Sequence, residues 1–378
     1  MDPDQQCCHN PDCVLRGQVG RGNIRIQSRK ERRYRCAACG RTFAATRDTP
    51  FYRLHRAADL LTIVVTLLCH GCPVQAIVAA FGLDERTVLR WQRRAGEHCR
   101  QGHEHLVQTG QVELGHVQAD ELWIKLVGRR VWQAMALAVP SRLWLGGVVS
   151  AQRDGALIRR LVERVHACAA PGPLLVCVDG LASYVTAFVR AFRPLVRTGR
   201  RGRPRLVPDV GFQLGQVVKQ YAKRRVVAVS QRIVRGTLAT IVAALAATGG
   251  GKVINTAFIE RLNATFRACC VPLVRRADAR RAAVALAHRD ATLVAGMFLV
   301  GGAYNFCWPH DSLRLLASAS TGPKWRECTP AMAAGLTDHC WRMEELLRYQ
   351  IPLPAWVTAK RRGRPPKPKS QPAKELAA

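Results

Sequence analysis

The sequence predicts a multidomain protein in which a cysteine-bearing module and an all-α module precede a larger α/β core. Three observations carry this prediction. Cysteines occur as two pairs near the N-terminus, apolar residues recur at three- and four-residue intervals over about Leu54 to Cys99, and strand-like runs alternate with helical runs over about Gly115 to Trp308. The 378 residues fit two to three domains at roughly 150 residues each.

The charge balance predicts a polyanionic partner. Lysine and arginine total 58 residues against 26 acidic residues, which gives a formal net charge of +32, while 48% of the residues are apolar and can form a core. Global disorder is therefore excluded. The apolar run Leu60 to Cys69 is too short to span a membrane, and Ala282 to Phe306 is interrupted by charged residues. Because the N-terminus carries no apolar leader, we expect a cytoplasmic protein without a membrane partner.

The order of these composition changes predicts five segments. They are a cysteine-bearing module at 1–52, an all-α module at 53–105, an α/β core at 112–310 with an insertion at about 195–253, a helical C-terminal region at 311–358, and a basic tail at 359–378. The tail is rich in proline, lysine and arginine and nearly lacks apolar residues, so we expect it to be disordered until it binds.

The paired cysteines predict a structural zinc site. Cys8 and Cys13 enclose four residues, and Cys36 and Cys39 enclose two. Four thiolates spaced in this way can close a tetrahedral Zn²⁺ site, which would stabilise a module too small to own a large core. Cys7 lies beside Cys8 and remains an alternative ligand.

The second module has the pattern of a helix-turn-helix. Val74 to Phe81 predicts a short helix, Gly82 to Asp84 a turn, and Glu85 to His98 a second helix. That second helix carries the residues that we expect to contact DNA: Arg86, Thr87, Arg90, Arg93 and Arg94. The alternative is an amphipathic helix pair with a basic face toward solvent.

Three acidic residues stand beside apolar runs in a chain that has few acids. Asp120, followed by Glu121, interrupts the first predicted strand of the core, Asp179 ends the strand that begins at Leu174, and Glu260 lies in a predicted helix. Carboxylates from separate segments can hold two Mg²⁺ ions that activate an attacking oxygen and stabilise a leaving oxygen, as in nucleases and transposases. The alternative for each acid is a salt bridge with one of the many arginines.

The tail contains an AT-hook pattern in which Arg362, Gly363 and Arg364 form the central tripeptide. An extended Arg-Gly-Arg segment fits the narrow minor groove of A·T-rich DNA, where arginines meet the most negative potential. A second copy of Arg-Gly-Arg-Pro occurs at Arg201 to Pro204 within the core. Short basic tetrads also arise by chance in arginine-rich chains.

These motifs and their order resemble the DDE transposases of the insertion-sequence-one family. The resemblance is carried by Tyr34 to Phe43 in the cysteine module, the helix-turn-helix, Ala119 to Trp123, Val178 to Gly180 and Ile259 to Asn263, and it spans about residues 8 to 306. It implies a ribonuclease-H-like core at 112–310 in which Asp120, Asp179 and Glu260 coordinate two catalytic Mg²⁺ or Mn²⁺ ions.

The resemblance also implies an activity and partners. A transposase of a bacterial insertion sequence binds the terminal inverted repeats of its element as double-stranded DNA, cleaves them and joins them to target DNA. It would be at least a homodimer, because two element ends are held together, and it would be associated with the nucleoid.

One feature departs from the family pattern. The shortest members place the third acid close after the second, whereas about eighty residues separate Asp179 from Glu260 in this chain. Asp209 is therefore a rival for the third position.

Two alternative functions remain at this point. A zinc-ribbon, helix-turn-helix transcription regulator would bind DNA specifically without metal-dependent cleavage. A structure-specific DNA nuclease built on the same core would cut DNA without joining it.

Overall fold

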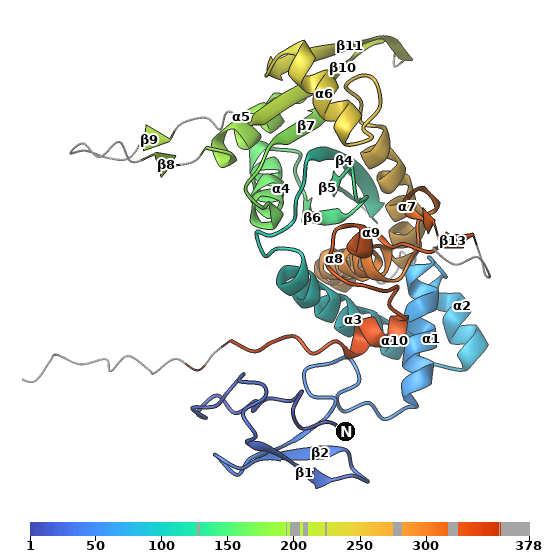
Figure 1. The fold of residues 1–378 in the computed structure, drawn as a ribbon. Coiled ribbons are helices and arrows are strands. Elements are labelled where there is room, and N and C mark those ends of the chain that lie inside the picture. The colour runs from blue at the N-terminus through green and yellow to red at the C-terminus, as the bar shows by residue number, and fades with distance from the viewer. Residues whose placement is uncertain are drawn as a thin grey trace, which may run out of the picture. The chain divides into compact units, whose positions relative to one another are not determined.

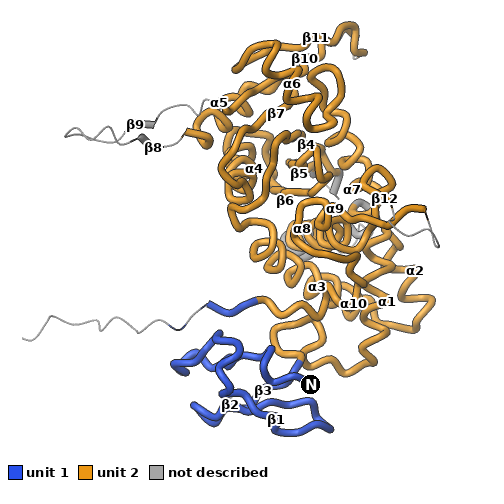
Figure 2. Tube along the Cα trace, viewed as in Figure 1, with its two compact units in different colours: residues 1–45, 352–378 blue, residues 46–351 orange. Residues whose placement is uncertain are grey.

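The computed structural model divides into two compact units, which Figure 2 distinguishes by colour. Unit 1 comprises Met1–Ala45 with Pro352–Ala378, and unit 2 comprises Thr46–Ile351. The structure describes residues 1–126, 129–193, 195–196, 205–206, 211–223, 225–274, 282–316, 324–354 and 356. The predicted AT-hook residues Arg362, Gly363 and Arg364, its second copy at Arg201 to Pro204, and the rival acid Asp209 lie outside these described residues.

Unit 1 is built on a small antiparallel sheet. Its strands are β1 (Ile24–Ser28), β2 (Arg33–Cys36) and β3 (Thr42–Ala44), paired in the order β1-β2-β3. Ile24, Tyr34 and Phe43 are buried together with Cys8, Cys13 and Cys36. This core is small, so the module has little apolar burial to stabilise it without a further element such as a metal.

Unit 2 contains a six-stranded mixed sheet with the order β11-β10-β7-β4-β5-β6 (Figure 1). The strands are β4 (His116–Leu126), β5 (Arg129–Ala138), β6 (Trp144–Ser150), β7 (Leu174–Asp179), β10 (Phe212–Ala222) and β11 (Arg225–Arg235). The β4, β7 and β10 strands run parallel, whereas β5, β6 and β11 pair antiparallel with their neighbours. The predicted α/β core is confirmed at this level.

Helices cover the sheet on both faces. The relevant helices are α4 (Gly155–Cys168), α5 (Ala182–Ala191), α6 (Leu238–Ala247) and α7 (Ala257–Val274). Successive strand residues point to opposite faces. Glu121 of β4 contacts Tyr184 of α5, and Asp120 contacts Asn263 of α7. The α5 and α7 helices therefore lie on opposite faces of the sheet.

The N-terminal helices of unit 2 pack on the core through one long helix. They are α1 (Ala58–Cys69), α2 (Val74–Phe81) and α3 (Glu85–Leu106). Gly82 ends α2 in the left-handed conformation, and Asp84 caps α3 by accepting a 2.9 Å hydrogen bond from the Arg86 backbone N–H. The α2 and α3 helices begin at the predicted residues, Val74 and Glu85, but α3 continues eight residues beyond His98.

The α3 helix packs closely against α8 (Ala282–Phe306). A Cβ added to Gly96 would overlap the backbone of Ala295, so only glycine permits this approach. Near its C-terminal end α3 also reaches the sheet, where a ring nitrogen of the buried His103 lies 3.2 Å from the carbonyl oxygen of Leu145. The helix thus connects the helix-turn-helix segment to β6.

From Asp290 on, where its side chains are described, the α8 helix is apolar and largely buried. Within the described part of the chain, Asp290–Leu313 is the segment with the length and hydropathy to cross a membrane, and 72% of its window is buried inside the protein. Asn305 of this helix hydrogen-bonds both backbone groups of Trp144 on the edge strand β6. Such contacts are those of a helix in a protein core.

Two segments differ in detail from the sequence expectations. Residues 195–253, expected as an insertion, include β10 and β11 of the main sheet as well as the short pair β8 (Leu195–Val196) and β9 (Arg205–Leu206). The described part of 311–358 is mostly irregular. It contains a 3₁₀ turn (Asp311–Leu313), the strands β12 (Leu315–Leu316) and β13 (Trp325–Arg326), and the helices α9 (Pro330–Ala333) and α10 (Met343–Arg348).

Candidate functional site

Two acidic residues lie where the pairing between the parallel strands β4 and β7 stops. Ala119 of β4 is in register with Val178 of β7, and this pairing stops at that level. Asp120 and Asp179 follow directly, and Asp179 is the last residue of β7. Because the strands run in the same direction, both carboxylates lie at the same edge of the sheet.

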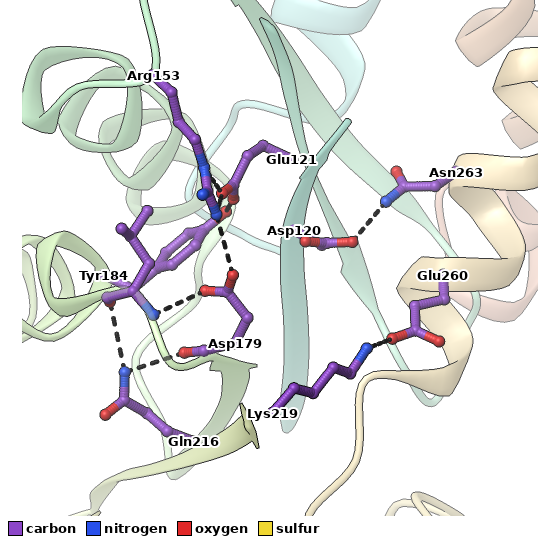
Figure 3. A network of polar contacts seen from close by, with 10 residues as sticks. Asp120, Glu121, Arg153, Asp179, Tyr184, Gln216, Lys219, Glu260 and Asn263 are labelled. Atoms are coloured by element: carbon purple, nitrogen blue, oxygen red, sulfur yellow. Dashed lines mark hydrogen bonds and ion pairs between the residues drawn. The ribbon is translucent and has the colours of Figure 1, made fainter. Parts of the chain in front are cut away.

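The α7 helix brings two more polar side chains to this edge (Figure 3). Asn263 donates a hydrogen bond of 2.8 Å from Nδ2 to Oδ2 of Asp120. Glu260, one turn earlier, accepts hydrogen bonds at Oε1 from Lys219 Nζ at 2.8 Å and from Thr256 Oγ1 at 3.0 Å. The spacing of three residues places Glu260 and Asn263 on one face of the helix.

Gln118 fixes the start of α7 against β4. This side chain is fully buried, and its Oε1 accepts hydrogen bonds from the backbone N–H groups of Phe258 at 3.0 Å and Ile259 at 3.1 Å. Its Nε2 donates to the backbone oxygen of Asn255 at 2.9 Å. The first N–H groups of a helix have no partner within the helix, so a side chain that satisfies them determines where the helix begins. Gln118 thereby sets the position of Glu260 relative to Asp120.

Arg153 links Glu121, on the opposite face of β4, to Asp179. Its guanidinium ion-pairs with Glu121 and also donates from Nη2 to Oδ2 of Asp179 at 3.2 Å. The Glu121 side chain is fully buried and accepts a further hydrogen bond of 2.7 Å from the Tyr184 hydroxyl. A buried carboxylate needs such partners to be tolerated.

The three predicted acids line one open cavity of about 440 Å³. Asp120, Asp179 and Glu260 share its wall with the basic side chains of Arg153 and Lys219. A tighter group forms within this region, because carboxylate oxygens of Asp120, Glu121 and Asp179 all lie within 4.8 Å of one another. Glu260 is not part of that tighter group, and it is held instead by Lys219.

The crowding of carboxylates changes their acidity. Burial raises the pKa of Asp120 to about 7, and the negative charges of Glu121, Asp179 and Glu260 add to this effect. Burial also raises the pKa of Glu121. At Glu260 burial raises the pKa, but the hydrogen bonds from Lys219 and Thr256 and the charge of Lys219 outweigh it and leave the pKa below its ordinary value. Oxygen donors that repel one another in this way fit a divalent cation such as Mg²⁺ or Mn²⁺.

The four predicted zinc ligands converge in unit 1. Cys8, Cys13, Cys36 and Cys39 have sulfur atoms within 4.8 Å of one another, with 3.6 Å between the sulfurs of Cys8 and Cys39. None of them is in a disulfide, and Asn23 donates a 3.3 Å hydrogen bond to the Cys36 sulfur. This donor set could hold a tetrahedral Zn²⁺ ion. Cys7, the alternative ligand, lies outside the group.

The predicted DNA-contacting residues of α3 do not share one environment. Arg86, Arg90 and Arg93 are exposed, and Thr87 is half-buried. Arg94 is also half-buried, and its guanidinium donates to the backbone oxygen of Tyr52. Burial, together with the charge of Arg90, lowers the pKa of Arg94. Arg94 thus has a structural contact, whereas Arg86, Arg90 and Arg93 present their charge to solvent.

No protein-family model matches the chain, and no curated protein matches its sequence significantly. Any function assigned to it therefore rests on its own residues and their arrangement.

The sequence alone did not single out Gln118, Arg153, Tyr184 or Lys219. Gln118 is a polar residue inside an apolar run. This pattern could have indicated a buried side chain with specific hydrogen-bond partners, because buried amides must find partners. Arg153 follows β6 in a turn, and Lys219 lies in the segment expected as an insertion. Neither position carries a local signal.

Proposed function

We propose that the chain is a DNA transposase with a ribonuclease-H-like core, similar to those of the insertion-sequence-one family. The observation that carries the proposal is that Asp120, Asp179 and Glu260, far apart in the sequence, line one cavity. They come from a strand, a neighbouring parallel strand and a helix, which is the order that the motifs predicted.

The acids of the cavity would hold the catalytic cations. Asp120 and Asp179 would be ligands, with Glu121 beside them and Glu260 completing the site from α7. Bound divalent cations supply activation of an attacking oxygen and stabilisation of the leaving oxygen in phosphodiester cleavage and strand transfer. Asn263 holds Oδ2 of Asp120 by its hydrogen bond, and Gln118 holds the helix that carries both Asn263 and Glu260. Arg153 and Lys219 place positive charge on the same wall, where a DNA phosphate would approach.

The other modules fit a double-stranded DNA partner. The exposed arginines of α3 and the overall charge of +32 favour binding to element ends and target DNA. The four-cysteine group would bind structural zinc. Because transposition joins two ends, the active form would be at least a dimer.

A cleavage assay tests the proposal. The full chain is incubated with duplex DNA bearing the inverted repeats that flank its coding sequence, in Mg²⁺, in Mn²⁺ and without divalent metal. We expect metal-dependent nicks with free 3′ ends, followed by joining to target DNA. Asp179→Asn should abolish both reactions while duplex binding persists. Asp311→Asn is the matched control, because Asp311 is exposed and does not line the cavity.

The same assay separates the alternative functions. Specific duplex binding without cleavage in any metal would identify a transcription regulator. Metal-dependent cleavage of branched or flapped DNA without joining would identify a structure-specific nuclease. Full strand transfer by Asp179→Asn would exclude the acidic cavity as the catalytic centre.

A further inference from the structure

Two tryptophans lie next to each other on the β4–β5 hairpin that leaves the acidic cavity. Trp123 of β4 is directly opposite Trp132 of β5 in the antiparallel register. Directly opposite residues share a face and have neighbouring Cβ atoms. Glu121 lies two residues before Trp123, so it points to the same face of β4.

Each tryptophan carries an arginine over its ring. The guanidinium carbon of Arg153 lies 5.2 Å from the ring centre of Trp132, and that of Arg130 lies 4.9 Å from the ring centre of Trp123. Arg153 lines the cavity and is also the residue that binds Glu121 and Asp179. The four side chains Arg153, Trp132, Trp123 and Arg130 therefore form a continuous series, here called the Arg–Trp row, from the acids toward the hairpin end.

The outer tryptophan is accessible. Trp123 exposes 46% of its surface, whereas Trp91 and Trp144 expose 2% and 0% and belong to the core. Arg130 is exposed and Trp132 is half-buried. An exposed indole ring beside a guanidinium offers a surface on which a nucleic acid base can stack.

We propose that the Arg–Trp row binds an unpaired DNA strand and leads it to the acidic cavity. Trp123 would stack on a base, and Arg130 and Arg153 would contact the phosphates on either side of it. Stacking of this kind requires a base whose face is free, so the row would prefer single-stranded or frayed DNA to blunt duplex. The proposal deepens the proposed function by specifying the form of the substrate at the cavity, and it rests on that function.

Binding measured without divalent metal tests the row independently of cleavage. The probe is a labelled mixed-sequence single-stranded oligodeoxynucleotide, with a blunt duplex of the same sequence as comparison, and fluorescence anisotropy reports the affinity of the full chain. We expect Trp123→Ala to weaken single-strand binding on the order of tenfold and Trp123→Phe to restore most of it. Duplex binding, which α3 supports, should change less than twofold.

The chain offers a matched control. Trp325 exposes 40% of its surface and has the guanidinium carbon of Arg314 at 4.7 Å from its ring centre, but it lies on β13 and does not line the cavity. Trp325→Ala should leave single-strand affinity unchanged. Arg130→Gln should reduce the slope of log affinity against log salt by about 0.7, the value for one phosphate contact on a single strand. Circular dichroism confirms that each variant is folded.

The outcomes distinguish the row from the proposed function. An unchanged single-strand affinity in folded Trp123→Ala, or an equal loss in Trp325→Ala, would overturn the row even if metal-dependent cleavage is observed. A selective loss in Trp123→Ala would support the row even if no cleavage occurs, in which case the proposed transposase activity alone fails.

Discussion

The side-chain amide of Asn263 donates a 2.8 Å hydrogen bond to Oδ2 of Asp120, which lines the cavity, and thereby ties α7 to β4. Asn263 is nearly fully buried, and its other amide atom, Oδ1, has no hydrogen-bond partner within the described part of the structure. This hydrogen bond from a neutral donor favours the ionised form of Asp120. Burial and the negative charges of Glu121, Asp179 and Glu260 act in the opposite direction and raise the pKa of Asp120 to about 7.

The crowded carboxylates predict a pH-dependent stability for the protein without divalent cations. Folding raises the pKa of Asp120 from 3.8 to about 7, mainly through burial. The folded protein therefore retains this proton more strongly than the unfolded chain, and its stability falls as pH rises from about 4 to about 7. At 1.36 kcal/mol per pH unit the loss is at most roughly 4 kcal/mol. Asp120→Asn removes this loss. The free energy of unfolding of the variant, relative to that of the wild type, should therefore increase from about pH 4 to about pH 7 and stay constant above pH 7.

Urea unfolding at pH 5, 6, 7 and 8 in buffer free of divalent metal measures this difference. Asp311→Asn, which alters an exposed acid outside the cavity, should follow the wild type at every pH. Parallel curves for the wild type and Asp120→Asn would contradict the prediction.

Replacing Gln118 should lower the free energy of unfolding more than replacing another buried amide side chain. Gln118→Leu removes its hydrogen bonds and leaves the N–H groups of Phe258 and Ile259 unpaired, which should lower the free energy of unfolding by about 2 kcal/mol or more. Gln133→Leu is the matched control, because Gln133 is equally buried on β5 but its Oε1 has no partner among the described residues. Its replacement should be nearly neutral.

The same variants report on metal binding. Because Gln118 positions the helix that carries Glu260 and Asn263, Gln118→Leu should weaken Mn²⁺ binding, measured by electron paramagnetic resonance, whereas Gln133→Leu should not. Equal Mn²⁺ affinities for the two variants would show that α7 does not contribute to the cation site.

The cysteine group predicts one zinc ion per chain. Cys36→Ser should release it, because Cys36 is one of the four converging thiols and is also hydrogen-bonded by Asn23. Cys7→Ser should retain the metal. Zinc content by atomic absorption, after purification of each variant, decides between them. Loss of zinc from Cys7→Ser together with retention in Cys8→Ser would show that Cys7, and not Cys8, is the zinc ligand.

The arginines of α3 should separate into two classes. Arg86→Gln and Arg90→Gln should each weaken duplex binding and reduce the salt slope by about 0.9, as expected for one lost phosphate contact. Arg94→Gln should instead lower the melting temperature with little change in slope, because Arg94 donates to the backbone of Tyr52. A slope change at Arg94 as large as that at Arg86 would be inconsistent with its observed packing.

Local sequence patterns predicted individual helices and strands better than the features that depend on contacts between them. The short helix at Val74–Phe81 and the strand from Leu174 are where periodicity and apolar runs placed them. The extension of α3 past His98 was not predictable, because this stretch contains Gly102 and several histidines, which are weak helix formers. Contacts with α8 and with the Leu145 carbonyl stabilise it. Tertiary packing overrides propensity there.

The candidate site was predicted only in part, because several of its contacts join residues that are far apart in the sequence. Asp120, Asp179 and Glu260 were found as scarce acids beside apolar runs, and the structure brings them to one cavity. Glu121 follows Asp120 on the same strand and lies toward the opposite face, yet its carboxylate reaches within 4.8 Å of those of Asp120 and Asp179. Pairings such as Gln118 with Asn255 join residues 137 positions apart, and no local pattern encodes them.

The missing side chain at Gly96 has a mechanical consequence. The backbones of α3 and α8 are in close contact there, so α3 cannot rotate without moving α8. The α8 helix is in turn hydrogen-bonded to the edge strand β6 through Asn305. Under the proposed function, DNA bound at the exposed arginines of α3 would therefore be held in a fixed orientation relative to the sheet that carries the acidic cavity.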